Sequence, residues 1–170
     1  MSGKHVGVIL LVIAVVGGFW YMRHDRDARQ IWRQFDALVE AAEKEPGDSQ
    51  VALVRKSRTV QSSFTSNAVI RLSPIFIPEI ERRELAALVF YFHGYIDSVR
   101  IQVSDRRLTI ADDRQSADMR FTARGRLERA GRREINTHAF RMEWVKHEGD
   151  WLIDRVEVHQ SIRPPGRSPE

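Results

Sequence analysis

The sequence contains no cysteine. This absence excludes thiolate ligands for a metal ion, and it excludes a lipid-modified cysteine at a mature N-terminus. It does not indicate a cellular compartment, because a cysteine-free domain tolerates both oxidising and reducing conditions.

Familiar catalytic and nucleotide-binding motifs are also absent. The sequence has no P-loop, no other glycine-rich phosphate loop and no GxSxG motif. Its histidines stand at positions 5, 24, 93, 138, 147 and 159, so no two have the i, i+4 spacing of metal ligands on one helix face. We therefore expect neither a bound metal nor a cofactor, and we find no internal repeat.

Lysine is scarce: there are 4 lysines against 23 arginines, with a net charge of +4 and a pI of about 9.8. Arginine clusters can bind nucleic acid or anionic lipid. Here the arginines are interleaved with 23 acidic residues, and no block of five like charges occurs. A biased composition explains this pattern, and we expect no nucleic-acid partner.

One long apolar segment stands out against these absences. Residues 6–22 are seventeen uncharged, mostly apolar residues, and a helix of that length reaches about 25 Å, the lower limit for crossing a bilayer. Lys4 precedes the segment, Arg23 follows it, and Trp20 and Tyr21 lie where interfacial aromatic residues are found. We predict an uncleaved single-pass membrane anchor over residues 1–23.

The main alternative is a cleaved signal peptide, which needs small residues at its cleavage site. Gly17 and Gly18 are small, but four bulky residues follow them.

The side of the membrane that the domain faces stays open. The arginines after the segment favour a cytoplasmic domain, whereas a short basic tail before an apolar segment is also the layout of an export signal.

The remaining residues suffice for one domain, which we place at residues 24–162. The last residues, 163–170, lack periodicity and are predicted to be disordered. Apolar residues at helical spacing predict helices over 26–45, 49–61 and 79–93.

The expected buried stripe of the first helix contains Phe35 and Leu38. The stripe of the third contains Leu85, Leu88 and Phe92, and Gly94 is expected to follow the end of that helix.

The apolar period then changes to two, which is typical of strands. Because Trp144 shares its register with Phe140 and Met142, we expect it to be buried. Together the alternating segments predict an antiparallel meander with one apolar face and one wet face. The strands are expected at 68–72, 98–110 with a turn at 105–106, 117–127, 137–145 and 151–158.

Three helices followed by a bent antiparallel sheet resemble the NTF2-like fold, also called SnoaL-like or cystatin-like. The similarity lies in the helix over 79–93 with the following IDSVRIQVSDRRLTIADDRQSADMRFTARG, and in FRMEWVKHEGDWLIDRVEV at 140–158. It implies an α+β domain, a cone of three helices packed on the sheet, behind the transmembrane helix. It also implies a single-pass protein of the bacterial inner membrane, with the domain on the periplasmic side.

In such a cone a pocket lies between the helices and the concave sheet face. The resemblance places Phe121, Phe140, Trp144, Leu88 and Phe92 along it. Enzymes of the superfamily hold Asp, His or Tyr there to move a proton. The candidates here are His93, His138 and Tyr91; a helix-terminal histidine such as His93 is also explained by the helix dipole alone.

The wet face carries the binding candidates Arg100, Arg120, Arg124 and Arg141, which would form a plate for an acidic protein partner or a homodimer. Cross-strand ion pairs explain part of this charge without any ligand.

Taken with the predicted anchor and the lack of a clear catalytic group, this surface leads us to expect a non-enzymatic, membrane-anchored binding or scaffold module. One alternative is a SnoaL-like isomerase, dehydratase or hydrolase acting on a small apolar substrate. Another is an assembly factor similar to the NTF2-like inner-membrane component of type IV secretion systems.

Overall fold

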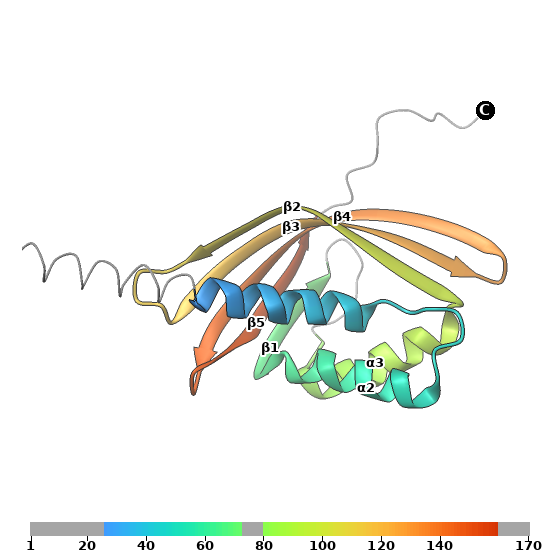
Figure 1. Ribbon diagram of the computed structural model, residues 1–170, viewed down its shortest axis with the longest axis horizontal. Coiled ribbons are helices and arrows are strands. Elements are labelled where there is room, and N and C mark those ends of the chain that lie inside the picture. The colour runs from blue at the N-terminus through green and yellow to red at the C-terminus, as the bar shows by residue number, and fades with distance from the viewer. Residues whose placement is uncertain (1–25, 73–79, 160–170) are drawn as a thin grey trace, which may run out of the picture. The chain divides into compact units, whose positions relative to one another are not determined.

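The computed structural model describes residues 26–72 and 80–159 (Figure 1). The predicted anchor and the predicted disordered tail lie outside these described residues. Within them, no helix combines the length and the apolar character needed to cross a membrane. The chain divides into two compact units, residues 1–34 and 35–170. The first contributes the start of a helix over 26–42, and the second contains the sheet and the other described helices.

Helices α2 and α3, both in the second unit, have bounds close to the predicted ones. Helix α2, Gln50–Ser62, begins where the side chain of Ser49 accepts a hydrogen bond from the Ala52 amide at 3.2 Å. Helix α3, Arg82–Tyr95, begins with a capping box in which Glu81 and Glu84 satisfy each other's backbone amides. The expectation that Gly94 follows the helix end is wrong, because α3 continues to Tyr95 and is capped by the extended Ile96.

A five-stranded sheet in the order β1-β5-β4-β3-β2 carries the rest of the domain (Figure 1). Strands β2 to β5 form the predicted antiparallel meander. The prediction of a wholly antiparallel sheet is wrong, because β1 pairs with β5 in parallel. A parallel pairing between distant segments leaves no trace in the local alternation. The strands are β1 Phe64–Leu72, β2 Ser98–Ile110, β3 Ser116–Arg129, β4 Arg132–His147 and β5 Asp150–His159.

The predicted turn at 105–106 is instead a bulge within one continuous strand. The pairing of β2 with β3 shifts between Ser104 and Arg107, and Asp105 has a left-handed φ of 54°. Val103 and Leu108 both point to the apolar side although they are five residues apart, which requires one extra residue between them.

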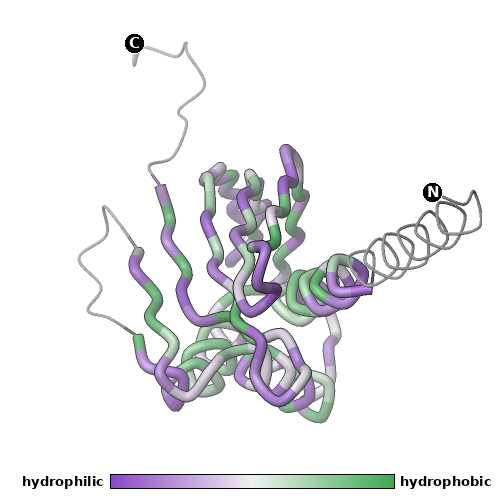
Figure 2. The backbone as a smooth tube through the Cα atoms, turned by 90° about the vertical axis from the view of Figure 1, so that its left-hand side faces the viewer, coloured by the Kyte–Doolittle hydropathy of each residue, from purple (hydrophilic) through white to green (hydrophobic). Residues whose placement is uncertain are grey.

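The apolar side of the sheet forms the core. The alternation of polar and apolar residues along the strands is visible in Figure 2. Trp144 and Met119 are fully buried, which confirms the predicted register. Phe35 meets Phe121 edge-on at 4.8 Å between ring centroids, and Phe121 stacks on Phe140 at 5.1 Å. This chain of three rings joins the helical layer to the concave face of the sheet.

Helix α3 turns a different side inward from the predicted one. The predicted core residues Leu88 and Phe92 are 45% and 43% exposed, whereas Leu85 and His93 are buried. Contacts at the end of α3 fix this rotation. The Lys44 ammonium donates to the carbonyls of His93 and Ile96 at 2.6 and 2.5 Å, and the His93 ring bonds the Ala42 carbonyl. A histidine therefore occupies a core position that an apolar pattern alone cannot recognise.

Candidate functional site

The concave face offers little polar chemistry. His138 lies on it, edge-on to Phe140 with 6.4 Å between ring centroids. Its Nδ1 is buried and has no hydrogen-bond partner among the described residues. The buried indole nitrogen of Trp144 likewise has none there. A proton-transfer site needs a titratable group held by a partner, and no described carboxylate bonds to His138.

The structure does not bring the three catalytic candidates together. The His93 ring is buried, and its Nε2 lies 3.2 Å from the Ala42 carbonyl oxygen. Burial lowers its pKa below the ordinary histidine value, an effect that the bond to Ala42 partly offsets and that the ammonium groups of Lys56 and Lys44 strengthen. Tyr91 is 64% exposed and packs against Tyr95 with 5.1 Å between ring centroids. His93 is thus a structural residue of the helical layer.

The outer face of the sheet carries the four arginines predicted to bind. The strand register places Arg120 opposite Arg141 and Arg100 opposite Arg126, all on the same side. Arg124, two residues from Arg126, shares that side. Sequence alternation is sufficient to find this grouping, although it does not tell which guanidinium groups are already paired.

One half of the outer face is an ion-pair network, which we call the paired half. Asp118 holds Arg120 with one carboxylate oxygen at 3.0 Å and Arg141 with the other. Arg141 also contacts Glu143 at 3.3 Å. The hydrogen bond from Arg141 to Asp118 raises the pKa of the guanidinium above its ordinary value.

The other half is a cluster of cations, which we call the open arginine cluster: Arg100, Arg124 and Arg126. None of the three forms an ion pair with a described residue, although two of them lie directly opposite each other. Like charges in that position destabilise a sheet. Glu128 lies farther along β3, but Arg133 occupies it at 2.7 Å and lowers its pKa.

An open cavity of about 540 Å³ lies on the paired half. Arg107 lines it opposite Arg120, and the sequence prediction misses this residue because it places a turn where the strand has a bulge. In the sequence, the bulge is signalled by the odd number of positions between Val103 and Leu108, two apolar residues that share one side of the strand. The cavity is lined by Asp105, Arg107, Arg120, Thr122, Arg141 and His159, among others.

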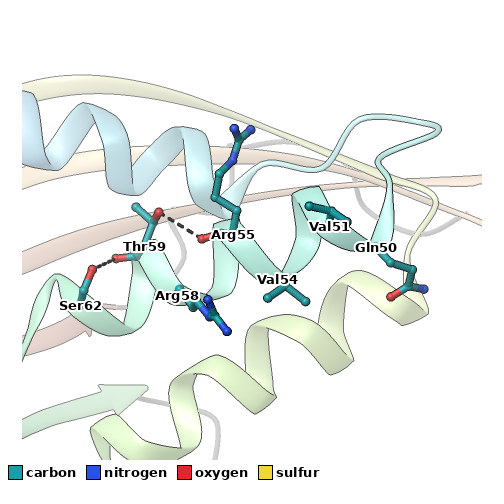
Figure 3. Close-up of a pocket in the computed structure, with 7 residues that line it drawn as sticks. All are labelled: Gln50, Val51, Val54, Arg55, Arg58, Thr59 and Ser62. Carbon is teal, nitrogen blue, oxygen red and sulfur yellow. Dashed lines mark hydrogen bonds between the residues drawn. The ribbon is translucent and has the colours of Figure 1, made fainter.

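A second cavity, of about 560 Å³, is a groove along α2 lined by Val51, Val54, Arg55 and Arg58, with Gln50, Thr59 and Ser62 (Figure 3). In the described ranges, 26–72 and 80–159, no three histidine, aspartate or glutamate side chains gather as a metal site would require.

Comparison with protein-family models finds no match, and comparison with curated proteins finds none. Solved structures do match. The NTF2-like protein with a cystatin-like fold from Novosphingobium aromaticivorans has 13% identity and a TM-score of 0.65, over 81% of this chain and 84% of that one. A hexachlorocyclohexane dehydrochlorinase, LinA type 2, has 9% identity and a TM-score of 0.64, over 87% and 97%. ActVI-ORFA from Streptomyces coelicolor has 15% identity and a TM-score of 0.60, over 79% and 96%.

The helices and the five-stranded mixed sheet make an α+β domain. The chain has the NTF2-like, or cystatin-like, fold. At these identities the likeness establishes the fold alone, and function has to be argued from the site.

Proposed function

We propose that this protein is a membrane-anchored NTF2-like module that binds an acidic partner on the outer face of its sheet. The observation that carries the proposal is the open arginine cluster. Arg100 and Arg126 lie opposite each other, and neither forms an ion pair with a described acidic residue; Glu128, two residues from Arg126, is bound by Arg133. An unfavourable like-charge arrangement is relieved when a ligand brings the missing negative charge.

The neighbouring paired half gives this observation its weight. Asp118 lies two residues from Arg120 on the same strand and neutralises the arginines around it. At the corresponding distance from Arg124, the same side of β3 has Thr122 and Arg126 in place of an acid. Composition bias explains many arginines, but it does not explain why Arg100 and Arg124 have no ion pair with a described acid while Arg120 and Arg141 share Asp118.

The anchoring part of the proposal rests on the apolar segment over residues 6–22. Location in the bacterial inner membrane with a periplasmic domain follows from the resemblance and belongs to the same proposal. An assembly factor of the type IV secretion kind would be one form of such a module, with an acidic protein as its partner. A homodimer through the outer face is disfavoured, because it would press one open arginine cluster against a second cationic face.

The test uses the full chain in detergent and fluorescein-labelled poly-L-glutamate as the acidic probe, followed by anisotropy. Replacing two charge contacts worth about 0.5–1 kcal/mol each corresponds to about 5- to 30-fold weaker binding. We expect that loss for the double variant Arg100→Glu with Arg124→Glu. The matched control changes Arg55 and Arg58 of α2 to Glu, which gives the same change in net charge, and should weaken binding much less than the double variant does. Equal binding by the wild type and both variants would refute the proposal.

The second candidate is an enzyme of the SnoaL-like type, and the comparisons favour it more than the geometry of the site does. LinA type 2 is a dehydrochlorinase with the same fold. The observation in this chain is the buried Nδ1 of His138 on the concave face, which has no hydrogen-bond partner among the described residues. Incubation with a panel of small apolar halides, alcohols and ketones, followed by mass spectrometry, tests it. Turnover by the wild type that is lost on changing His138 to Gln would replace the binding proposal with this one.

A further inference from the structure

The exposed apolar side chains of the described residues are concentrated on one helix pair. Eight large hydrophobic side chains of the described residues are exposed, seven of them on α2 and α3, and six of these seven form one group. By helical spacing Phe90 lies on another side of α3, and Ile135 lies on β4. We call the group of six the helical apolar face: Val51, Val54, Leu88, Tyr91, Phe92 and Tyr95.

On α3 these residues form a regular stripe. Leu88, Tyr91, Phe92 and Tyr95 have the spacing i, i+3, i+4 and i+7, which places them on one side of a helix. The buried side of α3, with Leu85 and His93, lies next to this stripe, so the helix carries more apolar surface than the core uses. An exposed group of large apolar side chains marks a site of interaction.

Helix α2 continues the same surface. The Gln61 amide donates to the Arg82 carbonyl at 3.5 Å, and the Arg82 guanidinium donates to the Gln61 carbonyl at 3.1 Å. The end of α2 therefore meets the start of α3, the two helices run antiparallel, and Val54 lies beside the middle of α3 (Figures 1 and 3). Val51, 79% exposed, lies one turn farther toward the end of α3.

The charges around the helical apolar face are of one sign on α2. This helix contains Arg55, Lys56 and Arg58 and no acidic residue. Lys56 is paired with Asp48 at 2.7 Å, whereas Arg55 and Arg58 line the groove beside Val51 and form no ion pair with a described residue. At the other end, the guanidinium of Arg129 lies 4.7 Å from the centre of the Tyr95 ring.

We propose that the helical apolar face lies on an anionic lipid bilayer, with its aromatic and aliphatic side chains in the headgroup region and Arg55 and Arg58 on the lipid phosphates. Apolar and aromatic residues bordered on α2 by arginine have the composition of helices that bind in the plane of a membrane interface. The one acid on this side of α3 is Glu84, in the first turn of the helix. The inference rests on the anchoring part of the proposed function, because residues 6–22 would hold the domain at the bilayer.

A second copy of the chain fits this surface less well. A two-fold contact through α2 would bring Arg55 and Arg58 of both copies together, and α2 offers no acid to separate them. A lipid surface supplies both the apolar medium and the negative charge.

The absence of cysteine makes a site-specific test direct. The full chain with the substitution Val54→Cys is labelled with an environment-sensitive dye and reconstituted with phosphatidylcholine alone, or with a quarter phosphatidylglycerol. Nitroxide lipid in both leaflets quenches any dye in contact with the bilayer. The matched control is Ile135→Cys, labelled at an exposed apolar position on the sheet. We expect strong quenching of the dye at position 54 in the anionic vesicles only, and no quenching of the dye at position 135.

Changing Arg55 and Arg58 together to Glu, or to Gln if the first variant folds poorly, should remove the quenching at position 54. Changing Arg100 and Arg124 to Glu should not. A chain that floats with vesicles but leaves the dye at position 54 unquenched overturns the inference and keeps the anchor. Flotation on anionic vesicles only, with that dye quenched, keeps the inference and overturns the anchor. No flotation on either vesicle overturns both.

Discussion

The two faces of the sheet differ in how completely their side chains are packed or paired within the domain. On the concave face, Trp144 and Met119 are fully buried and the ring of Phe121 is held between two others. On the outer face, three arginines lie together, and none of them forms an ion pair with a described acid. The same strands thus present a side whose interactions are complete within the domain and a side whose charge is not balanced. A binding surface is better sought on the second.

The largest effect is expected from breaking the concave face. Changing Trp144 to Ala removes a fully buried indole and should lower the free energy of unfolding by about 3–5 kcal/mol. Urea unfolding of the protein in detergent, followed by circular dichroism, measures it. A loss below about 1 kcal/mol would be incompatible with this packing.

The next prediction concerns how the free energy of unfolding depends on pH. The pKa of the buried His93 is lowered in the folded state, so the unfolded chain binds its proton more readily. Stability is complete above the unfolded pKa of about 6.5 and is lost as the pH falls from there toward the folded pKa. We expect the wild type to lose more stability between pH 7.5 and pH 5 than His93→Gln, measured by unfolding at both values. Identical losses would contradict a depressed pKa.

A smaller effect is expected within the paired half of the outer face. Changing Asp118 to Asn removes the partner of both Arg120 and Arg141. These groups are partly exposed, so the loss should be about 0.5–1 kcal/mol in low salt and less in 1 M salt. Binding of poly-L-glutamate should become tighter, because Arg120 is released while Arg141 keeps its contact with Glu143.

The smallest effect has the opposite sign. Arg126 faces Arg100 across β2 and β3 with no described acid between them. Changing Arg126 to Gln relieves this repulsion and should raise the unfolding free energy by about 0.2–0.5 kcal/mol in low salt. The gain should disappear in 1 M salt. A destabilisation would mean that this arginine contributes to folding.

Features that depend on alternation along a single strand are predictable from the sequence. The meander, the burial of Trp144 and the placement of Arg100, Arg120, Arg124 and Arg141 on one face are all consequences of a period of two. Which arginines are paired depends on the register between strands. Asp118 reaches Arg141 only because β4 places that residue opposite Arg120.

The failures come from contacts between distant segments. Leu88 and Phe92 have the spacing of core residues, but the contacts of Lys44 and Ala42 with the end of α3 turn the His93 side inward. The parallel pairing of β1 with β5 joins residues about ninety positions apart, and nothing local encodes it. The position of Arg107 is hidden by a bulge, although the spacing of the apolar residues around it does signal one.

The short segment around Lys44 has a consequence for how copies of this protein can meet. Strand β2 is the edge of the sheet, and an exposed edge invites pairing with another chain. Lys44 exchanges two backbone hydrogen bonds with Val99, and the Glu43 carboxylate accepts from the Ile101 amide at 2.7 Å. The bulge at Asp105 then interrupts the strand where this cover ends. This edge is therefore closed to strand-by-strand extension by another copy of the chain, which leaves β1 as the edge at which such pairing could begin.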